Sequence, residues 1–550
     1  MPLRQTVFNL RRAVGADARR WLLGRPWARR RLHRLGLSPL GHSSLAWIRD
    51  DGVFHTRAVF FNYFAMNYKL AESEYRFRLF DRDGACLGAW QQRARPNETL
   101  VVESREVLDR LGVRPPFDGT LGAEVQHEAL FPPRYLRANI DYYSDDGFVS
   151  TVHDQGRYVR LPTTTSQTLV HVLEDEVHET AVVLQNGYRY RRDPREFMAT
   201  ATIDLFNRQG DKRTAAVAPF PACGMRYVRL RELFPDAPSF LGGEAGGLRI
   251  RSNAPIPRTI PVIHNRVTGD YSVNHTGGDS ATDLSPRHVL AERSWPAAVW
   301  APVWSGLVEE RDDFHTAFSI FNHFVPRDVY AVDLRLYDNA GKLIKTLPEI
   351  VTFGPNETRV LTMEPILREH GIAPPFRGTA AMRLTPKSDG RPMPGDGMFK
   401  VNILYFNDRS LALHNTQDYL VLNSLREAHT LSSPRRTRIF GRVVENDIQE
   451  TLLGLTNFSS DDDYDVVSDT EIIVFDAAGE RSLKARLSIA PQTSALVGLR
   501  DLFPTVGAFL ASSAGVSSAL VVDSKVKIHG AVVLRNKLTG GLGADHLFGG

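Results

Sequence analysis

The feature that most constrains this chain is a pattern that recurs four times along its 550 residues. Each copy contains a strand ending on asparagine, a turn glycine, a proline before a later strand, and a histidine near its end. In chain order these are Asn62, Asn186, Asn322 and Asn457; Gly84, Gly210, Gly341 and Gly479; Pro96, Pro219, Pro355 and Pro491; and His153, His275, His414 and His546. The asparagine-to-histidine spacing is 91, 89, 92 and 89 residues. A spacing kept four times predicts four structural repeats.

The repeats also fall into two pairs. The first and third share the motifs Pro-Asn-Glu-Thr and Pro-Pro-Phe-x-Gly-Thr, at 96–99 and 115–120, and at 355–358 and 374–379. The second and fourth share Leu-Arg-Glu/Asp-Leu-Phe-Pro, at 230–235 and 499–504. This pairing indicates that a two-domain unit was duplicated as a whole.

Within a repeat the apolar residues alternate with polar ones, as in Tyr75, Phe77 and Leu79. That period is typical of a strand with one buried face, and the Asp-x-x-Gly segments suit hairpin turns. We therefore predict an all-β chain of four tandem immunoglobulin-like or fibronectin-like antiparallel β-sandwich domains, following a basic N-terminal helical segment. Each repeat is long enough to bury its own core, so we expect separately packed sandwiches. The predicted boundaries are 1–44 for the basic segment and 45–157, 158–290, 291–422 and 423–550 for the repeats.

The N-terminal segment is strongly basic. Residues 1–40 contain ten arginines and one acid, a charge of +9, so the remaining residues carry +4 − 9 = −5. Apolar residues recur there every three to four positions, which predicts an amphipathic helix. Such a helix could contact an anionic membrane surface or a polyanion, or it could pack on the first domain. The candidate contact residues are Arg11, Arg12, Arg19, Arg20, Arg29, Arg30 and Arg31.

The sequence contains no continuous apolar run of the ~18 residues that a membrane-spanning helix needs. No apolar region follows the N-terminal charges, as it would in a secretory signal. The two cysteines, Cys86 and Cys223, fall in different repeats, which favours a reducing compartment. We therefore predict a cytoplasmic protein that can associate with a membrane surface through its basic segment.

Histidines recur at two places in the repeats. The first group follows acidic residues before a strand, and the second lies at the end of each repeat. If the first and last strands of a sandwich run parallel, both groups would share one pole and could bind a transition metal. The alternative is hydrogen bonding to loop backbone, which Gln449 could also provide in the fourth repeat. The candidate ligands are His55, His153, His178, His275, His315, His414 and His546.

Three tryptophans, Trp295, Trp300 and Trp304, lie close together before the third repeat. They could stack on a sugar ring, or they could pack at the joint between repeats, as Trp47 would before the first repeat. The chain has no Gly-x-Ser-x-Gly motif, no phosphate-binding loop and no dinucleotide fingerprint.

We therefore predict a non-enzymatic binding or scaffold protein without a cofactor. It would present its tandem β-sandwich modules to a multivalent protein partner or a glycan, and its basic segment could tether it to a membrane. The alternative is a carbohydrate-binding or carbohydrate-active protein that uses the tryptophan-rich joint. Nucleic acid is the less favoured partner.

Overall fold

The computed structural model describes residues 42–63, 72–126, 136, 138–145, 149–154, 165–190, 192–275, 303–322, 329–387, 401–415, 437–459 and 461–549. The predicted basic segment lies outside the described residues, except that the first strand already begins at His42. The three predicted boundaries between repeats also lie outside them. Among the helices that the structure describes, none has both the length and the apolar character to cross a bilayer.

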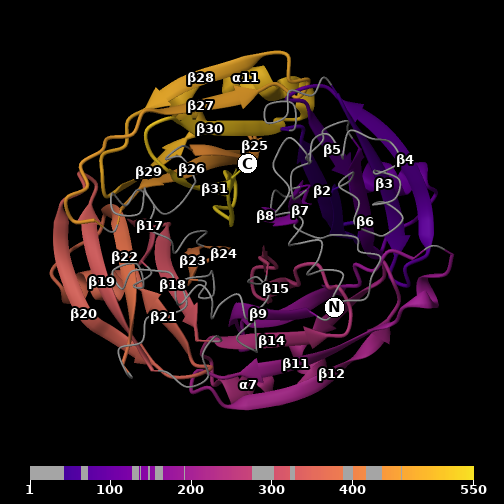
Figure 1. Cartoon of the computed structure of the whole chain (residues 1–550), viewed down its shortest axis with the longest axis horizontal. Coiled ribbons are helices and arrows are strands. Elements are labelled where there is room, and N and C mark those ends of the chain that lie inside the picture. The colour runs from indigo at the N-terminus through magenta and orange to yellow at the C-terminus, as the bar shows by residue number, and fades with distance from the viewer. Residues whose placement is uncertain are drawn as a thin grey trace, which may run out of the picture.

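The fold is all-β and antiparallel, as predicted. The described parts of the four sequence repeats, 42–154, 165–275, 303–415 and 437–549, are called repeats 1 to 4 below. Each repeat forms two sheets, and the four repeats follow one another around a ring (Figure 1). The sequence had suggested a row of sandwiches, whereas the last repeat packs against the first.

Repeats 1 and 3 have the same order of elements. Repeat 1 contains β1 (His42–Asp50), β2 (Phe54–Phe61), β3 (Ser73–Asp81), β4 (Cys86–Ala94), β5 (Thr99–Glu103), α5 (Ser104–Arg110), β6 (Phe117–Gln126), β7 (Ala138–Ser144) and β8 (Val149–Asp154). Repeat 3 contains β17 (Val303–Glu310), β18 (His315–Phe321), β19 (Tyr330–Asp338), β20 (Leu343–Phe353), β21 (Thr358–Thr362), α9 (Met363–Glu369), β22 (Phe376–Pro386), β23 (Val401–Phe406) and β24 (Leu411–Asn415).

Repeats 2 and 4 add short helical turns to this order. Repeat 2 contains β9 (Thr165–Val172), β10 (His178–Gln185), η1 (Pro194–Glu196), β11 (Ala199–Phe206), β12 (Lys212–Phe220), β13 (Met225–Arg229), α6 (Leu230–Leu233), α7 (Ala237–Leu241), β14 (Gly246–Ser252), β15 (Ile260–Asn265) and β16 (Tyr271–Val273). Repeat 4 contains β25 (Thr437–Val444), β26 (Gln449–Asn457), β27 (Thr470–Phe475), β28 (Ser482–Leu487), β29 (Thr493–Gly498), α10 (Leu499–Leu502), α11 (Val506–Leu510), η3 (Ala511–Ser513), β30 (Val516–Asp523), β31 (His529–Asn536), β32 (Leu542–His546) and β33 (Phe548–Gly549).

The two sheets of each repeat have a fixed strand order. In repeat 1 the outer sheet is β1-β6-β3-β4 and the inner sheet is β5-β2-β7-β8. The same order recurs in the other repeats, with β12, β20 and β28 at the outer edge and β16, β24 and β32 at the inner edge, and in repeat 4 a fifth strand, β33, is added beside β25. The outer-edge strands form the rim of the ring, and β8 and β24 lie near its centre (Figure 1).

The alternation seen in the sequence produces this packing. On β3 the side chains of Tyr75, Phe77 and Leu79 are buried, whereas Arg76 and Arg78 between them are half-buried. Side chains on opposite faces of a strand alternate, so only one face of the sheet enters the core.

The apolar cores are not all separate. Repeat 2 has a core made of its own residues. Another cluster joins Phe77 of repeat 1 to Met225 of repeat 2 and Phe475 of repeat 4. Because this core continues from one repeat into the next, neighbouring repeats bury apolar surface that each repeat would expose if it were alone.

The recurring turn glycine of each repeat contacts the next repeat. A Cβ atom on Gly84, Gly210, Gly341 or Gly479 would lie 2.1, 2.6, 2.1 or 2.6 Å from a carbonyl oxygen of the following repeat, that of Ala222, Pro355, Pro491 or Pro96 respectively. Each glycine also has a positive φ, between 70° and 84°. The glycine therefore closes its own hairpin and allows the turn to approach the neighbouring backbone closely.

The loop that receives each turn is braced by the recurring asparagine. The fully buried Asn62 donates its side-chain N–H groups to the carbonyl oxygens of Ala94 and Arg95, at 3.0 and 2.7 Å. Asn322 and Asn457 make equivalent bonds to Gly354 and Ile489. These bonds satisfy backbone groups of the receiving loop that would otherwise be buried without a partner.

Turn and loop together make a head-to-tail contact that is used four times. The fourth use closes the ring, because Thr99 of repeat 1 donates its backbone N–H to Ala477 of repeat 4 at 2.9 Å. A heterologous contact gives a closed ring when its rotation returns to the start, and an open helix when it does not. Here the closure occurs within one chain.

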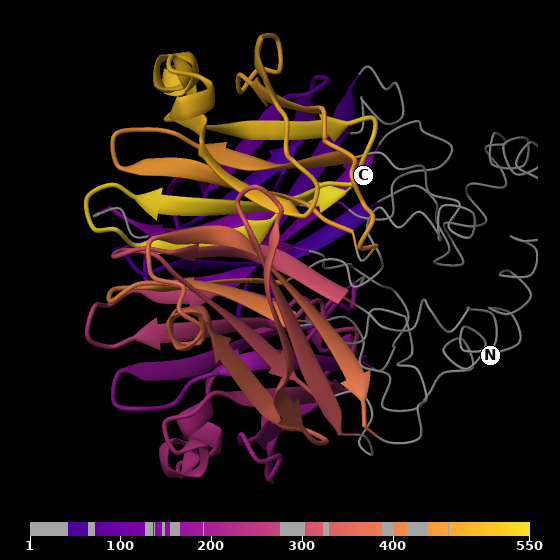
Figure 2. The same cartoon turned by 90° about the vertical axis from the view of Figure 1, so that its left-hand side faces the viewer.

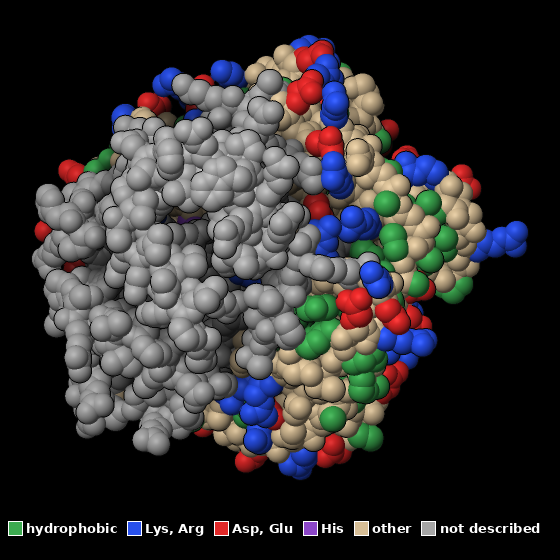
Figure 3. Space-filling view, turned by 45° about the vertical axis from the view of Figure 1, so that its right-hand side comes forward, with side chains coloured by type: hydrophobic (Ala, Val, Ile, Leu, Met, Phe, Trp, Pro, Cys, Tyr) green, Lys and Arg blue, Asp and Glu red, His purple; other side chains and the backbone are tan. Residues whose placement is uncertain are grey.

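The ring has two faces and an outer flank. Figure 2 shows it from the side, with the helices α7 and α11 at its left-hand face. Figure 3 shows part of the outer flank, where basic and acidic side chains stand beside one another and hydrophobic side chains form small groups. Interspersed charges of both signs are typical of an ordinary solvated surface.

Candidate functional site at the hub of the ring

The innermost strands of the four repeats meet at the centre of the ring. β8 adjoins β16 and β32, and β24 adjoins the same two strands, so the four strands surround a common axis. The terminal histidines lie near the ends of these strands. His153, His414 and His546 belong to β8, β24 and β32, and His275 lies just beyond the end of β16. We call these four histidines, together with Asp545, the hub.

The structure brings three of the four histidines into direct contact. The ring centroids of His153 and His275 are 4.2 Å apart, and those of His153 and His546 are also 4.2 Å apart. His275 and His546 are 5.7 Å apart. All three are buried, with 2%, 2% and 5% of their surface exposed. Residues separated by 122 to 393 positions in the chain therefore form one polar cluster.

His414 occupies a neighbouring position. Its ring lies 5.4 Å from that of Tyr405, in its own repeat. It also lines, with His529 and His546, a cavity of about 20 Å³ between repeats 3 and 4, which has room for about one water molecule.

Asp545 holds the cluster together. One carboxylate oxygen accepts a hydrogen bond from His153 Nδ1 at 2.9 Å and another from the backbone N–H of His546 at 2.8 Å. Burial raises the pKa of Asp545 to about 7, because a carboxylate without water is costly to ionise. Two arginines, Arg258 and Arg442, and His414 act in the opposite direction and lower this pKa.

Arg258 also contacts the cluster directly. One guanidinium nitrogen lies 2.7 Å from Nδ1 and 3.1 Å from Nε2 of His275, and it can donate to the ring nitrogen that carries no hydrogen. The hub thus combines imidazoles, one carboxylate and a nearby guanidinium. Chemically, such a group can share protons, bind one or more waters, or coordinate a metal ion.

The other three predicted histidines lie elsewhere. β2 and β8 flank β7 and both run antiparallel to it, so they are parallel to each other, as expected. His55, however, is near the start of β2, whereas His153 is near the end of β8. Contrary to expectation, the two groups of histidines therefore lie at opposite ends of each repeat.

At that other end, each repeat has a buried acid before the first strand of its inner sheet. The acids are Asp50, Glu174, Glu310 and Glu445. His55 and His315 donate from Nδ1 to Asp50 and Glu310, at 3.0 and 2.9 Å, whereas His178 contacts Asp175 at 3.1 Å. These histidines therefore contact acidic side chains, whereas the alternative drawn from the sequence was a hydrogen bond to loop backbone.

Each repeat has a short helix, α5, α6, α9 or α10, whose second residue lies near this end. At that position repeat 3 differs from the other three repeats. Arg231 and Arg500 pair with the buried acids Glu174 and Glu445, each at 2.6 Å. Arg105 of repeat 1 contacts His55. In repeat 3 this position is Glu364, and the ligand atoms of Glu364, Glu310 and His315 all lie within 4.8 Å of one another. Burial, and to a smaller extent the nearby Glu364 carboxylate, raises the pKa of Glu310.

Replacing Glu364 by arginine is expected to stabilise the protein by about 1 kcal/mol or more. The new guanidinium would pair with Glu310, and hydrogen bonds to charged groups contribute about 1.5–3 kcal/mol. The variant loses the exposed Arg368–Glu364 pair, which is worth a few tenths of a kcal/mol. Urea unfolding measures the difference. Glu369→Arg, on the same helix, makes the same charge change away from Glu310, and an equal gain in both variants would contradict the explanation.

The remaining predicted residues divide between the core and the undescribed part of the chain. Trp304 is 1% exposed and packs in the core of repeat 3, so it has no surface for a sugar. Trp295 and Trp300 lie outside the described residues, as do Arg11, Arg12, Arg19, Arg20, Arg29, Arg30 and Arg31. Both cysteines are free.

Asp545 and Arg258 were not anticipated from the sequence. Asp545 directly precedes the terminal histidine of repeat 4, where the other repeats have Val152, Asn274 and Leu413. An alignment of the four repeats would have shown this single acid beside a recurring histidine. Nothing local connects Arg258 to His275, because their contact depends on how the strands return to the axis.

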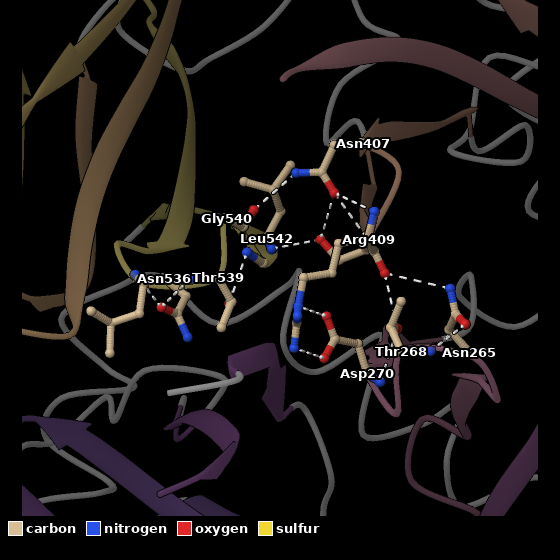
Figure 4. Close-up of polar contacts among 12 residues, drawn as sticks. Asn265, Thr268, Asp270, Asn407, Arg409, Asn536, Thr539, Gly540 and Leu542 are labelled. Atoms are coloured by element: carbon tan, nitrogen blue, oxygen red, sulfur yellow. Dashed lines mark hydrogen bonds and ion pairs between the residues drawn. The ribbon is translucent and has the colours of Figure 1, made fainter. Parts of the chain in front are cut away.

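A network of hairpin turns fixes the hub strands at one face of the ring (Figure 4). Asn407 of repeat 3 donates to the carbonyl oxygen of Gly540 in repeat 4 at 2.9 Å. Arg409 pairs with Asp270 of repeat 2 at 3.0 Å. The hairpin of repeat 3 thus bridges those of repeats 2 and 4, and the pairing is partly buried.

Comparisons with known proteins add little. No protein-family model matches the chain, and no curated protein matches it. One solved structure, "Biofilm associated protein - BSP domain", has 8% identity and a TM-score of 0.14, with 93% of this chain and 98% of that chain covered. A viral chemokine binding protein, R17 of rodent gammaherpesvirus Peru, has 10% identity and a TM-score of 0.14, with 73% and 88% covered. Likenesses this slight support no argument about function.

Proposed function

We propose that this chain is a non-enzymatic scaffold that binds a multivalent partner through one face of its ring. This face, called the turn face, contains the turns before the inner-sheet first strands and the hairpin turns that lead into the innermost strands β16, β24 and β32. Those turns are 51–53, 175–177, 311–314 and 446–448, and 266–269, 408–409 and 537–541. Sites held at fixed spacing allow a second contact to form at a high effective concentration.

The observation that carries the proposal is the position of the most exposed large hydrophobic side chains. Among the described residues these are Val267, Leu538 and Val53, at 76%, 71% and 63% exposure. All three lie on the turn face. Phe54, next to Val53, packs edge-to-face on Tyr271 of the repeat 2 hairpin, with ring centroids 4.6 Å apart, so the turns that carry Val53 and Val267 belong to neighbouring hairpins.

Apolar side chains at turn tips contribute nothing to the core that these turns enclose. Grouped exposed apolar residues with polar neighbours are typical of interaction sites. Around them the turns carry charges of both signs, including Asp51, Glu176, Arg266 and Lys537. Such a surface favours a protein partner with an apolar centre and a polar rim.

The double substitution Val267→Asp and Leu538→Asp should weaken partner binding strongly while leaving the fold intact. Tagged full-length protein would be used to enrich partners from extracts of the cells that produce it, with quantitative mass spectrometry. We expect specific partners to fall about tenfold or more, since each buried apolar contact and each new charge costs over 1 kcal/mol. Leu343→Asp, on the outer strand β20, is the matched control and should retain them. An unchanged partner set in the double variant would contradict the proposal.

The basic N-terminal segment is proposed as a membrane tether. Several arginines near an anionic surface add about 1 kcal/mol each, an attraction that salt screens. Co-sedimentation with phosphatidylserine vesicles should therefore pellet the full chain at low salt, and pellet it less when residues 1–40 are removed. Equal pelleting of both forms would exclude the tether without affecting the turn-face proposal. The carbohydrate alternative is weakened by the burial of Trp304.

A further inference from the structure

We propose that the hub binds one divalent transition-metal ion of the Zn²⁺ class. The four ligands would be His153, His275, His546 and Asp545. This inference goes beyond the scaffold function, because the hub and the turn face are separate parts of the ring and a partner could bind without the metal.

The ligand atoms already lie close together. One ligand atom from each of the four residues falls within 4.8 Å of all the others. In a tetrahedral zinc site with bonds of about 2.0–2.1 Å, the ligand atoms are about 3.3 Å apart. The ligand atoms therefore need to approach one another by at most about 1.5 Å, which rotations about the side-chain χ angles would provide.

The ligand atoms suit a metal ion that is intermediate between hard and soft, such as Zn²⁺. Imidazole nitrogen is a preferred ligand of zinc, copper and nickel, and one carboxylate adds a negative charge. Asp545 is buried beside His153 Nδ1, in a place where an ionised carboxylate without a cation is unfavourable. A bound cation would offset that cost directly.

The geometry indicates a structural site. Four protein ligands complete a tetrahedron, whereas catalytic zinc sites keep a position open. His153 comes from repeat 1, His275 from repeat 2, and His546 and Asp545 from repeat 4. The metal would therefore join the first and last repeats across the closure of the ring.

Two side chains, Arg258 and His414, lie beside the four proposed ligands but do not bind the metal. Arg258 now donates to the ring of His275, so its guanidinium must leave one ring nitrogen when the metal binds. His414 lies in the hub but outside the group of four, beside Tyr405. It should be dispensable for binding, and His414→Gln is therefore a matched control within the same cluster.

The test uses the full chain, stripped with a chelator and titrated with Zn²⁺ by calorimetry and with Co²⁺ by visible absorption. We expect one ion per chain and the intense visible bands of tetrahedral Co²⁺. His275→Gln and His546→Gln keep hydrogen-bonding side chains and should weaken binding by about 100-fold or more, as loss of a direct ligand exceeds the 10–100-fold effect of outer partners. His414→Gln and His178→Gln should bind like the unmodified chain.

Several results would overturn the proposal. If the unmodified chain gives neither calorimetric binding nor a Co²⁺ spectrum, the hub is a hydrogen-bonded cluster only. If His315→Gln removes the binding and the hub variants retain it, the ion sits instead at Glu310, His315 and Glu364. Circular dichroism of each variant checks that the fold persists, and the spectrum of the unmodified chain is decisive even if a variant unfolds.

Discussion

Replacing Arg442 by methionine is expected to lower the free energy of unfolding by about 3–5 kcal/mol. Arg442 of β25 in repeat 4 pairs with Asp141 of β7 in repeat 1, and each side chain is only 1% exposed. Removing the guanidinium leaves a carboxylate buried at the joint that closes the ring. Arg57 also acts on Asp141 electrostatically, which should keep the loss towards the lower end of the range.

Two further variants test whether the loss of stability comes from leaving a buried charge without its partner. Changing both residues, Arg442→Met with Asp141→Leu, removes the pair without leaving a buried charge, so much of the stability should return. Arg95→Met breaks the exposed pair between Arg95 and Glu480, which joins the same two repeats, and should cost much less, because water screens exposed charges. Urea unfolding measures all four proteins. Equal losses for the buried and the exposed pair would refute the argument.

Replacing Gly341 by alanine should destabilise the joint between repeats 3 and 4 more than the left-handed backbone alone explains. The new Cβ would lie 2.1 Å from the carbonyl oxygen of Pro491 and 3.1 Å from the Thr493 side chain. A backbone carbonyl cannot rotate away as the end of a side chain can. Overpacking of this kind costs about 1–3 kcal/mol, in addition to about 1–2 kcal/mol for the positive φ.

Gly371 is the matched control, because it lies in the same repeat with a φ of 75° but has no atom within 4 Å of its Cβ position. Gly371→Ala should therefore show the backbone cost alone. Among the equivalent glycines, Gly84 should be as sensitive as Gly341, and Gly210 and Gly479 less so, since their contacts are 2.6 Å. Calorimetric melting compares the series. If Gly341→Ala and Gly371→Ala lose the same stability, the contact between the Gly341 turn and repeat 4 does not contribute to stability.

Much of the fold could be predicted because its causes are local. The alternation in β3, the positive φ of Gly84 and the repeated landmarks depend on residues a few positions apart. The recurring asparagine is another landmark visible in the sequence, but its bonds to a distant loop, as from Asn62 to Ala94, appear only in the structure. The same landmarks were incompletely understood. Gly84 and Pro96 were interpreted as parts of a hairpin and a strand boundary, whereas they belong to turns and loops that join neighbouring repeats.

The candidate site could be predicted only in part. The terminal histidines were selected by their spacing, but the expected partner of His153 was His55 of the same repeat. Its actual neighbours, His275 and Asp545, come from other repeats. The departure of repeat 3 at Glu364 was also missed, because its significance depends on which acid the other helices contact.

The sequence by itself determined that this protein is built from four related β units, because strand period and turn chemistry act over a few residues. Only the tertiary structure decided that the units form a closed ring with a buried histidine hub. Closure depends on the angle at which each turn enters the next loop, and a small angle repeated four times decides between a ring and an open row. That angle is a property of packed surfaces, and no short stretch of the chain contains it.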